Sequence, residues 1–183
     1  AQVCDGPVCV TKARQSRLDD LAGPGKEALR LLRGALGDRA PVAVRESTAL
    51  RGIGDTPERS RDSVFIDFDD ASFAAAEGKQ LTRALVGQGL APACNPSSAV
   101  EFIAVESVAP QSIAASWALG EDLRPIDETK YSAREQADLA GPVWKKFISL
   151  PKSEQRQRIG AMHAAAVSCS GDPLDVLAGG VPR

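Results

Sequence analysis

The sequence predicts an α+β protein in which a small mixed or antiparallel sheet is packed by helices and the C-terminal third is helical. A run of apolar residues at Val64–Ile66 is typical of a strand that is covered on both faces. Beyond residue 132, by contrast, apolar residues recur at helical spacing. The 183 residues, of which 43% are hydrophobic and 25% charged, are enough for one well-packed domain, expected over 1–183.

The first 62 residues combine one clear helical pattern with polar and irregular stretches. Leu29, Leu32 and Leu36 fall on one helix face, and the glycine that follows supplies a stop signal. Gly23-Pro24-Gly25 is expected to interrupt the chain before that helix. The expected elements are an irregular segment at 1–24 with one helical turn at Ser16–Leu21, a helix at Lys26–Leu36, a short strand at Pro41–Arg45 and an exposed polar loop at Ser47–Asp62.

The central segment predicts a β-α-β-β order, which favours the α+β class. Asp69 or Asp70 is expected to cap the helix of this unit, and Gly87 and Gly89 to end it. Apolar residues alternate from Val100 onward, and alternation is typical of a half-buried strand. The expected elements are a strand at Ser63–Phe68, a helix that ends near Gln88, and two strands at Val100–Val108 and Ser112–Leu119 on either side of Pro110-Gln111.

The C-terminal third predicts two helices and a final turn. Val143, Phe147 and Ile148 contribute to an apolar stripe of the first helix, which Gly141-Pro142 is expected to break or restart. The expected elements are helices at Ser132–Ser149 and Lys152–Cys169, a turn of helix at Leu174–Leu177 and a frayed tail at 178–183.

The chain contains four cysteines, Cys4, Cys9, Cys94 and Cys169, and four cysteines allow three pairings. Because Gly6-Pro7 favours a turn between the first two, we expect the bonds Cys4–Cys9 and Cys94–Cys169. The alternative is a metal site, but the spacing Cys-x4-Cys matches zinc motifs loosely and the other two cysteines are isolated. We therefore expect two disulfides and no metal.

The compartment expected from these cysteines is the periplasm or the extracellular space. The chain begins Ala-Gln-Val without a Met, which is typical of a mature N-terminus after removal of a signal peptide. The alternative is an arbitrary boundary. The Ala/Arg/Gly-rich composition suggests a bacterium with a GC-rich genome.

Charge and motifs exclude several function classes. The net charge of −2 gives no general basic character, so no nucleic-acid partner is expected. No apolar run approaches the roughly 20 residues of a membrane-spanning helix. The sequence has no Walker loop, no Gly-x-Gly-x-x-Gly and no Cys-x-x-Cys motif, so no cofactor is predicted.

The sharpest catalytic candidate is the pair Asp67 and Asp69, which directly follows the apolar strand. The run Val64–Asp70 resembles the first motif of haloacid-dehalogenase-type phosphatases. The resemblance implies that Asp67 is a nucleophile, that Asp69 is an acid/base, and that both help to hold magnesium. It covers about seven residues, and the family prefers Thr or Val where this chain has Asp70. The alternative is that Asp69 or Asp70 only caps a helix.

Two further parts of the family pattern bear on the resemblance. The Lys-bearing motif has no convincing counterpart in this sequence, and the nearest candidate for the downstream acidic pair is Glu121-Asp122. The phosphatase hypothesis therefore rests on the first motif.

His163 is the only histidine, so any Ser-His-Asp or Cys-His site must use it. The sequence has no Gly-x-Ser-x-Gly elbow to supply a serine, and Cys169 is too far along the helix to share its face. In an Ala-rich helix a lone histidine is typical of a surface or boundary position. We therefore expect no catalysis by His163.

Two basic regions are candidate partner-binding surfaces. Trp144, Lys145 and Lys146 lie in a basic stretch of the C-terminal third, and an anionic partner could bind there. In the expected loop at Ser47–Asp62, three arginines stand among acidic residues: Arg51, Arg59 and Arg61. The alternative for both regions is a solvated surface without a partner.

The shortage of catalytic motifs favours a non-enzymatic role. The sequence predicts an exported domain of the bacterial envelope that binds another envelope or secreted protein. One form of such a domain is an immunity or inhibitor protein that neutralises a toxin or hydrolase. The first alternative is a metal-assisted phosphoester hydrolase that uses Asp67 and Asp69, and the second is a structural component of envelope assembly.

Overall fold

The structure is a computed structural model, and it describes residues 1–47, 59–68, 76–94, 101–126 and 133–180. The described part of the chain forms a mixed sheet and a set of helices that dominate the C-terminal part, which confirms the α+β class. The strands are β1 (Gln2–Asp5), β2 (Val8–Thr11), β3 (Ala43–Glu46) and β4 (Ser63–Ile66). The helices are α1 (Leu18–Leu36), α3 (Gly78–Leu90), α4 (Glu101–Leu119), α5 (Ala133–Ile148), α6 (Lys152–Ser168) and α7 (Pro173–Leu177), with short 3₁₀ helices at Lys12–Arg17 and Gly37–Arg39.

The four strands are ordered β1-β2-β3-β4, with an antiparallel pair β1–β2 and parallel pairs β2–β3 and β3–β4. The expectation of an irregular segment at 1–24 is wrong, because β1 and β2 form a hairpin at this end of the chain. Gly6 makes the turn possible, since its φ of 57° lies in the left-handed region that favours glycine. The strands expected near Pro41–Arg45 and Ser63–Phe68 are confirmed as β3 and β4.

Helix α1 begins at Leu18, so the expectation that Gly23-Pro24-Gly25 interrupts the chain is wrong. The reason is the close contact between α1 and the sheet. A Cβ at Gly25 would lie 2.7 Å from a methyl carbon of Val8, so only glycine lets the helix lie this close to β2. The burial gained along α1 outweighs the roughly 3 kcal/mol that an internal proline costs a helix.

The two strands expected at Val100–Val108 and Ser112–Leu119 are wrong, because one helix, α4, runs through both segments and through Pro110. Between Val108 and Ser116 almost every side chain of α4 is buried. A helix buried on all sides has no polar stripe, so its 3.6-residue period is invisible in the sequence. What resembled strand alternation is a continuous apolar helix.

Helix α3 begins at Gly78 and not near Asp69, which corrects the expected cap. Glu77 occupies its N-cap position, so neither aspartate caps this helix, and Asp69 and Asp70 lie outside the described residues. The expected end at Gly89 is also slightly early. Gly89 lies inside α3, at the point where α3 crosses α1. Glycine is needed there for close packing, because a Cβ would come within 2.6 Å of the Leu32 side chain.

The C-terminal helices follow the prediction closely. Helices α6 and α7 match the expected bounds within one residue. Helix α5 continues through Gly141-Pro142, so the expected break is wrong. The ring of Pro142 is exposed, and the helix is held by the buried side chains of Ala140 and Phe147.

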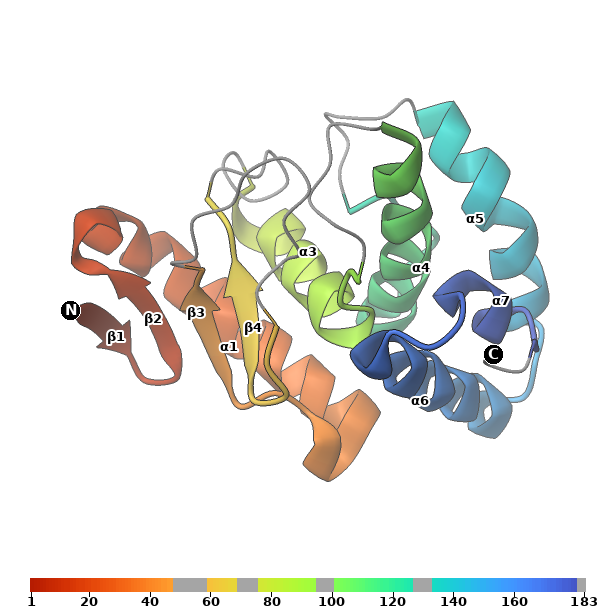
Figure 1. The fold of residues 1–183 in the computed structure, drawn as a ribbon, viewed down its shortest axis with the longest axis horizontal. Helices are drawn as coiled ribbons and strands as arrows, with labels where there is room; N and C mark the ends of the chain where they lie inside the picture. The colour runs from red at the N-terminus through yellow and green to blue at the C-terminus, as the bar shows by residue number, and fades with distance from the viewer. Residues whose placement is uncertain (48–58, 69–75, 95–100, 127–132, 181–183) are drawn as a thin grey trace.

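The sheet and the C-terminal helices lie on opposite sides of α3 (Figure 1). Helix α1 passes behind the sheet, and α1 and α3 both contact it and one another. Helix α3 then packs on α4, which packs on α5. The core is continuous across these layers, from Val44 and Ile66 in the sheet to Leu85 in α3 and Phe147 in α5. The end of α6 approaches the sheet side of the molecule, and a cavity lies there.

Candidate functional site

The two disulfide bonds have the expected pairing. Cys4 and Cys9 oppose one another directly in the β1–β2 hairpin, with their Cα atoms 4.1 Å apart. Cys94 and Cys169 join the segment after α3 to the end of α6, across 75 residues of sequence. Bonds of this kind fit an oxidising environment. The second bond lies next to a cavity, since Pro92 and Ser168, close to its two cysteines in the chain, line that cavity.

Arg59 fastens the segment before β4 to the same end of α6. Its guanidinium donates hydrogen bonds to the backbone oxygens of Ala166 and Val167, the latter at 3.0 Å, and contacts Sγ of Cys169. These carbonyls carry the partial negative charge of a helix C-terminus, which a cation stabilises. Burial lowers the pKa of Arg59 from its usual value. Its two terminal nitrogens are thus engaged within the protein rather than presented to a partner.

A cavity of about 670 Å³ lies beside this anchor, between α6 and the start of β4. Ligand pockets typically range from about 300 to 1,000 Å³, so it has room for a small molecule. Besides Arg59, the basic side chains in its wall are Arg39, Arg61 and His163. The acidic side chains in its wall are Asp38 and Asp62. Apolar wall residues include Pro41, Val64, Phe65, Pro92 and Val167.

His163 lies on α6 and is buried, with only 8% of its surface exposed, so the expected surface or boundary position is corrected. Its Nδ1 lies 3.2 Å from the backbone oxygen of Leu90 in α3. A carbonyl oxygen can only accept, so Nδ1 donates and carries the proton. Burial lowers the pKa of His163, the positive charge of Arg39 lowers it further, and the Leu90 and Gly89 carbonyls oppose the shift.

Asp67 follows β4 at the carboxyl end of the parallel strands. It is half-buried and has an interaction partner in the protein. At the same edge of the sheet, Glu46 accepts a hydrogen bond from the Thr11 backbone at 2.6 Å and lies 3.6 Å from Nε of Arg14. Within the residues that the structure describes, no three His, Cys, Asp or Glu side chains are grouped to hold a metal ion. Of the expected site residues, Asp69 and Arg51 lie outside the described part.

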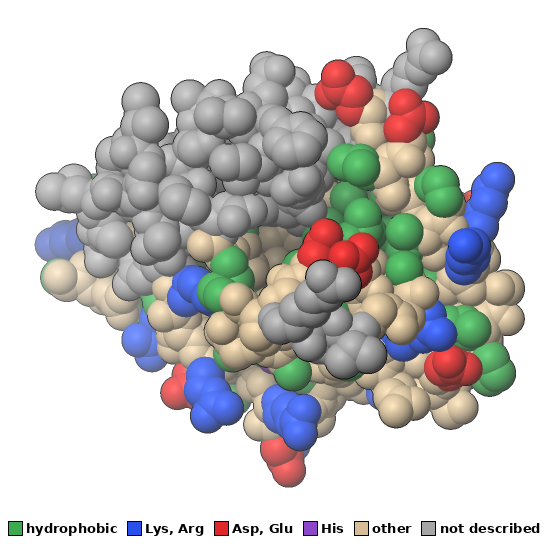
Figure 2. Space-filling view, turned by 45° about the vertical axis from the view of Figure 1, so that its right-hand side comes forward, with side chains coloured by type: hydrophobic (Ala, Val, Ile, Leu, Met, Phe, Trp, Pro, Cys, Tyr) green, Lys and Arg blue, Asp and Glu red, His purple; other side chains and the backbone are tan. Residues whose placement is uncertain are grey.

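The C-terminal part of helix α5 carries apolar and basic side chains, which we call the α5 surface: Trp144, Lys145, Lys146 and Ile148. Among the described residues, the exposed large hydrophobic side chains are Leu139 at 37%, Ile148 at 46% and Val42 at 63%. Two of these three lie on α5. Trp144 is half-buried, with its ring centroid 6.4 Å from that of Phe147. Figure 2 turns this side of the molecule forward and shows hydrophobic side chains beside lysine and arginine.

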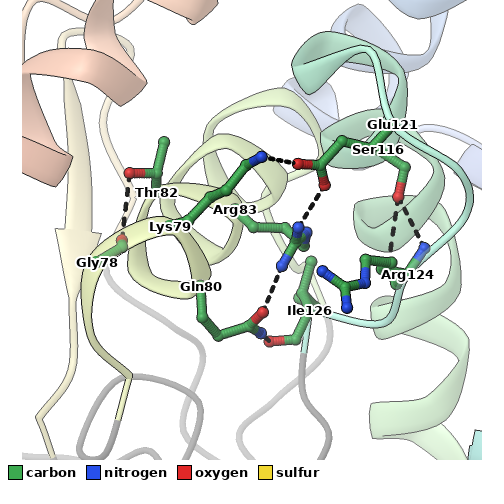
Figure 3. A network of polar contacts seen from close by, with 9 residues as sticks. All are labelled: Gly78, Lys79, Gln80, Thr82, Arg83, Ser116, Glu121, Arg124 and Ile126. Carbon is green, nitrogen blue, oxygen red and sulfur yellow. Dashed lines mark hydrogen bonds and ion pairs between the residues drawn. The ribbon is translucent and has the colours of Figure 1, made fainter.

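A polar network joins α3 to the chain after α4 (Figure 3). The buried guanidinium of Arg83 pairs with Glu121, which also pairs with Lys79, and Gln80 accepts a hydrogen bond from Arg83 at 2.5 Å. Hydrogen bonds from Lys79 and Arg83 lower the pKa of Glu121. Glu121, the nearest candidate for a phosphatase acidic pair, is thus engaged in ion pairs that connect α3 to the chain after α4.

Comparison with protein-family models, with curated proteins and with solved structures finds no match for this chain. In the described part, no helix combines the length and apolar character that a membrane crossing requires. The cavity is the feature that sequence analysis missed, because Arg39, Arg61 and His163 are far apart in the chain and share no motif. Only the conspicuous single histidine could have drawn attention to it.

Proposed function

We propose that this protein is an exported, non-enzymatic binding domain that docks on another protein through the α5 surface. The observation that carries the proposal is the exposure of Ile148 at the end of α5, next to the half-buried Trp144 and two exposed lysines. An exposed apolar side chain beside an aromatic ring, with charged residues around them, is typical of protein interfaces.

The chemistry of the α5 surface specifies the partner. Trp144 and Ile148 are four residues apart and therefore lie on the same side of the helix. Lys145 is three residues before Ile148 and shares this side, and Lys146 is exposed in the same turn. The complementary surface has an apolar centre for the indole and the isoleucine, and acidic side chains at its rim for the ammonium groups.

The compartment that fits this role is the bacterial periplasm or the extracellular space, because both disulfides persist under oxidising conditions. An immunity or inhibitor protein is the specific form that we favour. Such a protein needs a stable scaffold and one complementary surface, and it forms a stoichiometric complex with its target. A structural component of the envelope would instead associate with itself.

The test is affinity capture from the envelope and secreted fractions of the source organism, with three forms of the oxidised protein. We expect the wild type to retain one saturable protein partner, and the charge reversal Lys145→Glu/Lys146→Glu combined with Ile148→Glu to lose it. The control Arg30→Glu changes an exposed residue of α1 and keeps the partner. A partner that the α5 variant retains contradicts the proposal.

A second candidate is a magnesium-dependent phosphoester hydrolase. It is favoured by the place of Asp67, since sites in sheets with parallel strands form at the carboxyl ends of those strands. A hydrolase of this kind shows turnover of a phosphomonoester that depends on magnesium and is abolished by Asp67→Asn. Turnover that survives Asp67→Asn rejects this candidate.

A further inference from the structure

The cavity beside α6 contains an unused hydrogen-bond acceptor. Because Nδ1 of His163 donates to the Leu90 oxygen, the other ring nitrogen, Nε2, has a lone pair in the neutral imidazole. Among the described residues, the hydrogen bond that the ring forms is the one from Nδ1 to Leu90, and the carbonyl of Gly89 also lies near the ring. Within the same residues, the buried side-chain atoms that lack a partner are Nε of Arg59 and Nε of Arg83, and Nε2 of His163 is not one of them. It therefore faces the open space of the cavity that His163 lines.

The same cavity has cationic groups without an internal partner. Arg39 and Arg61 are exposed at its wall, and neither forms an ion pair or side-chain hydrogen bond with the described part of the chain. Within the described residues, the two carboxylates of the wall form no ion pair with these arginines. Asp38 is fully exposed and lies 3.8 Å from Arg33, and Asp62 is exposed as well.

We propose that this cavity binds a small oxyanion that also carries a hydroxyl group, either a phosphate ester or a carboxylate. Arg39 and Arg61 hold the anionic group, since a planar guanidinium matches the oxygens of phosphate and carboxylate. His163 accepts a hydrogen bond from the hydroxyl at Nε2. An anion without a hydrogen-bond donor cannot form a hydrogen bond with Nε2, because the lone pair of Nε2 only accepts.

The wall of the cavity is fixed before any ligand binds. The Cys94–Cys169 disulfide and the Arg59 anchor both hold the end of α6 on which His163 lies. Sγ of Cys94 lies 3.0 Å from the Ala166 oxygen, which is also a partner of Arg59. A preformed site spends little binding energy on ordering its own groups. The site stands independently of the α5 surface, which lies on a different helix.

The single histidine makes the test direct, because one imidazole signal reports on the cavity. The ¹H–¹³C NMR signal of His163 is followed during titration with glycerol 3-phosphate, glycerate and methyl phosphate at about pH 7 and constant ionic strength. We expect a saturable shift with glycerol 3-phosphate or glycerate, and the stronger of the two identifies the anionic group. Methyl phosphate, which lacks the hydroxyl, should bind at least about fivefold more weakly.

Three variants locate the binding. Arg39→Gln and Arg61→Gln should each weaken binding about tenfold, because each removes one charged partner of the anion. Arg45→Gln removes an exposed arginine of β3 that does not line the cavity, and should leave binding unchanged. The proposal is overturned if no saturable shift occurs at millimolar ligand, or if binding is unaffected in both cavity variants. Equal binding of methyl phosphate overturns the role of the hydroxyl.

Discussion

The cavity beside α6 and the α5 surface present positive charge in opposite ways. The cavity is concave, arginines and a buried histidine line it, and its walls come from segments far apart in the sequence. The α5 surface is made of exposed and half-buried side chains from a single helix. The shape of the cavity thus depends on contacts between residues far apart in the sequence, such as the Cys94–Cys169 disulfide and the Arg59 hydrogen bonds. The α5 surface depends only on one helix. Substitutions at the residues that hold the end of α6 should therefore lower stability, whereas substitutions on the α5 surface should affect partner binding and leave stability nearly unchanged.

The largest expected effect on stability comes from removal of the Cys94–Cys169 disulfide beside the cavity. Replacing Cys94 and Cys169 by serine should lower the free energy of unfolding by about 4 kcal/mol, because the bond closes a loop of 75 residues. The same change at Cys4 and Cys9 should cost only about 2 kcal/mol, since that loop is short. Urea denaturation of the two double variants measures the difference. Equal losses would mean that the long bond does not constrain the unfolded chain as this comparison requires.

A smaller loss of stability is expected at Arg59. Arg59→Met removes the charged donor to the carbonyls of Ala166 and Val167 and should cost about 2 kcal/mol. The matched control is Arg61→Met, two residues away, whose side chain is exposed and has no described partner. Thermal or urea unfolding should therefore distinguish two arginines of the same segment. If both variants unfold alike, Arg59 is not an anchor.

The buried histidine predicts a pH dependence of stability. Burial lowers the folded-state pKa of His163 below the unfolded value of about 6.5. The contribution of the neutral imidazole is fully present above that value and is lost as the pH falls through the folded pKa, since unfolding then takes up a proton. The NMR titration of the single histidine should give a pKa below about 6.5, and His163→Gln should reduce the loss of stability on mild acidification.

The charge of Arg39 provides the control for this pH dependence. Arg39→Gln removes a positive charge that acts on the imidazole, so the pKa of His163 should rise in that variant. The other charged groups of the cavity wall, Asp38, Arg59, Arg61 and Asp62, are unchanged by this substitution. A wild-type pKa at or above the value of a free histidine would contradict the buried, neutral state.

The smallest effect on stability is expected at the α5 surface. Ile148→Glu together with Lys145→Glu and Lys146→Glu changes exposed side chains only, so the free energy of unfolding should stay within about 1 kcal/mol of the wild type. The variant that loses the partner should thus remain folded, with the same denaturation midpoint. A large loss of stability would mean that these side chains support the core.

Turn residues and apolar spacing in the sequence predicted those elements whose structure is set by residues close together in the chain. Gly6-Pro7 gave the turn that pairs Cys4 with Cys9, and the stripe in α6 gave its bounds within one residue. Prediction failed where tertiary packing overrides local preference. Pro24, Pro110 and Pro142 each lie inside a helix, because the burial gained by the whole helix exceeds the cost of one proline.

The two candidate regions differ in the same way. The lysines and the tryptophan of the α5 surface are neighbours in the sequence, so reading the sequence was enough to indicate them. The cavity joins Arg39, Arg61 and His163, and only the crossing of α3 with α1 and the position of α6 bring these residues together. Residue spacing in a single sequence cannot predict that residues so far apart in the chain line one cavity.

The central claim, that the α5 surface binds another protein, is tested most directly by site-specific photocrosslinking. A photoreactive residue is placed at Ile148, and in a second sample at Val42, which is also apolar and exposed but lies just before β3. With the envelope and secreted fractions of the source, we predict a saturable crosslink to one protein from position 148 and none from position 42. A crosslink that forms equally from both positions, or only from position 42, would contradict the account.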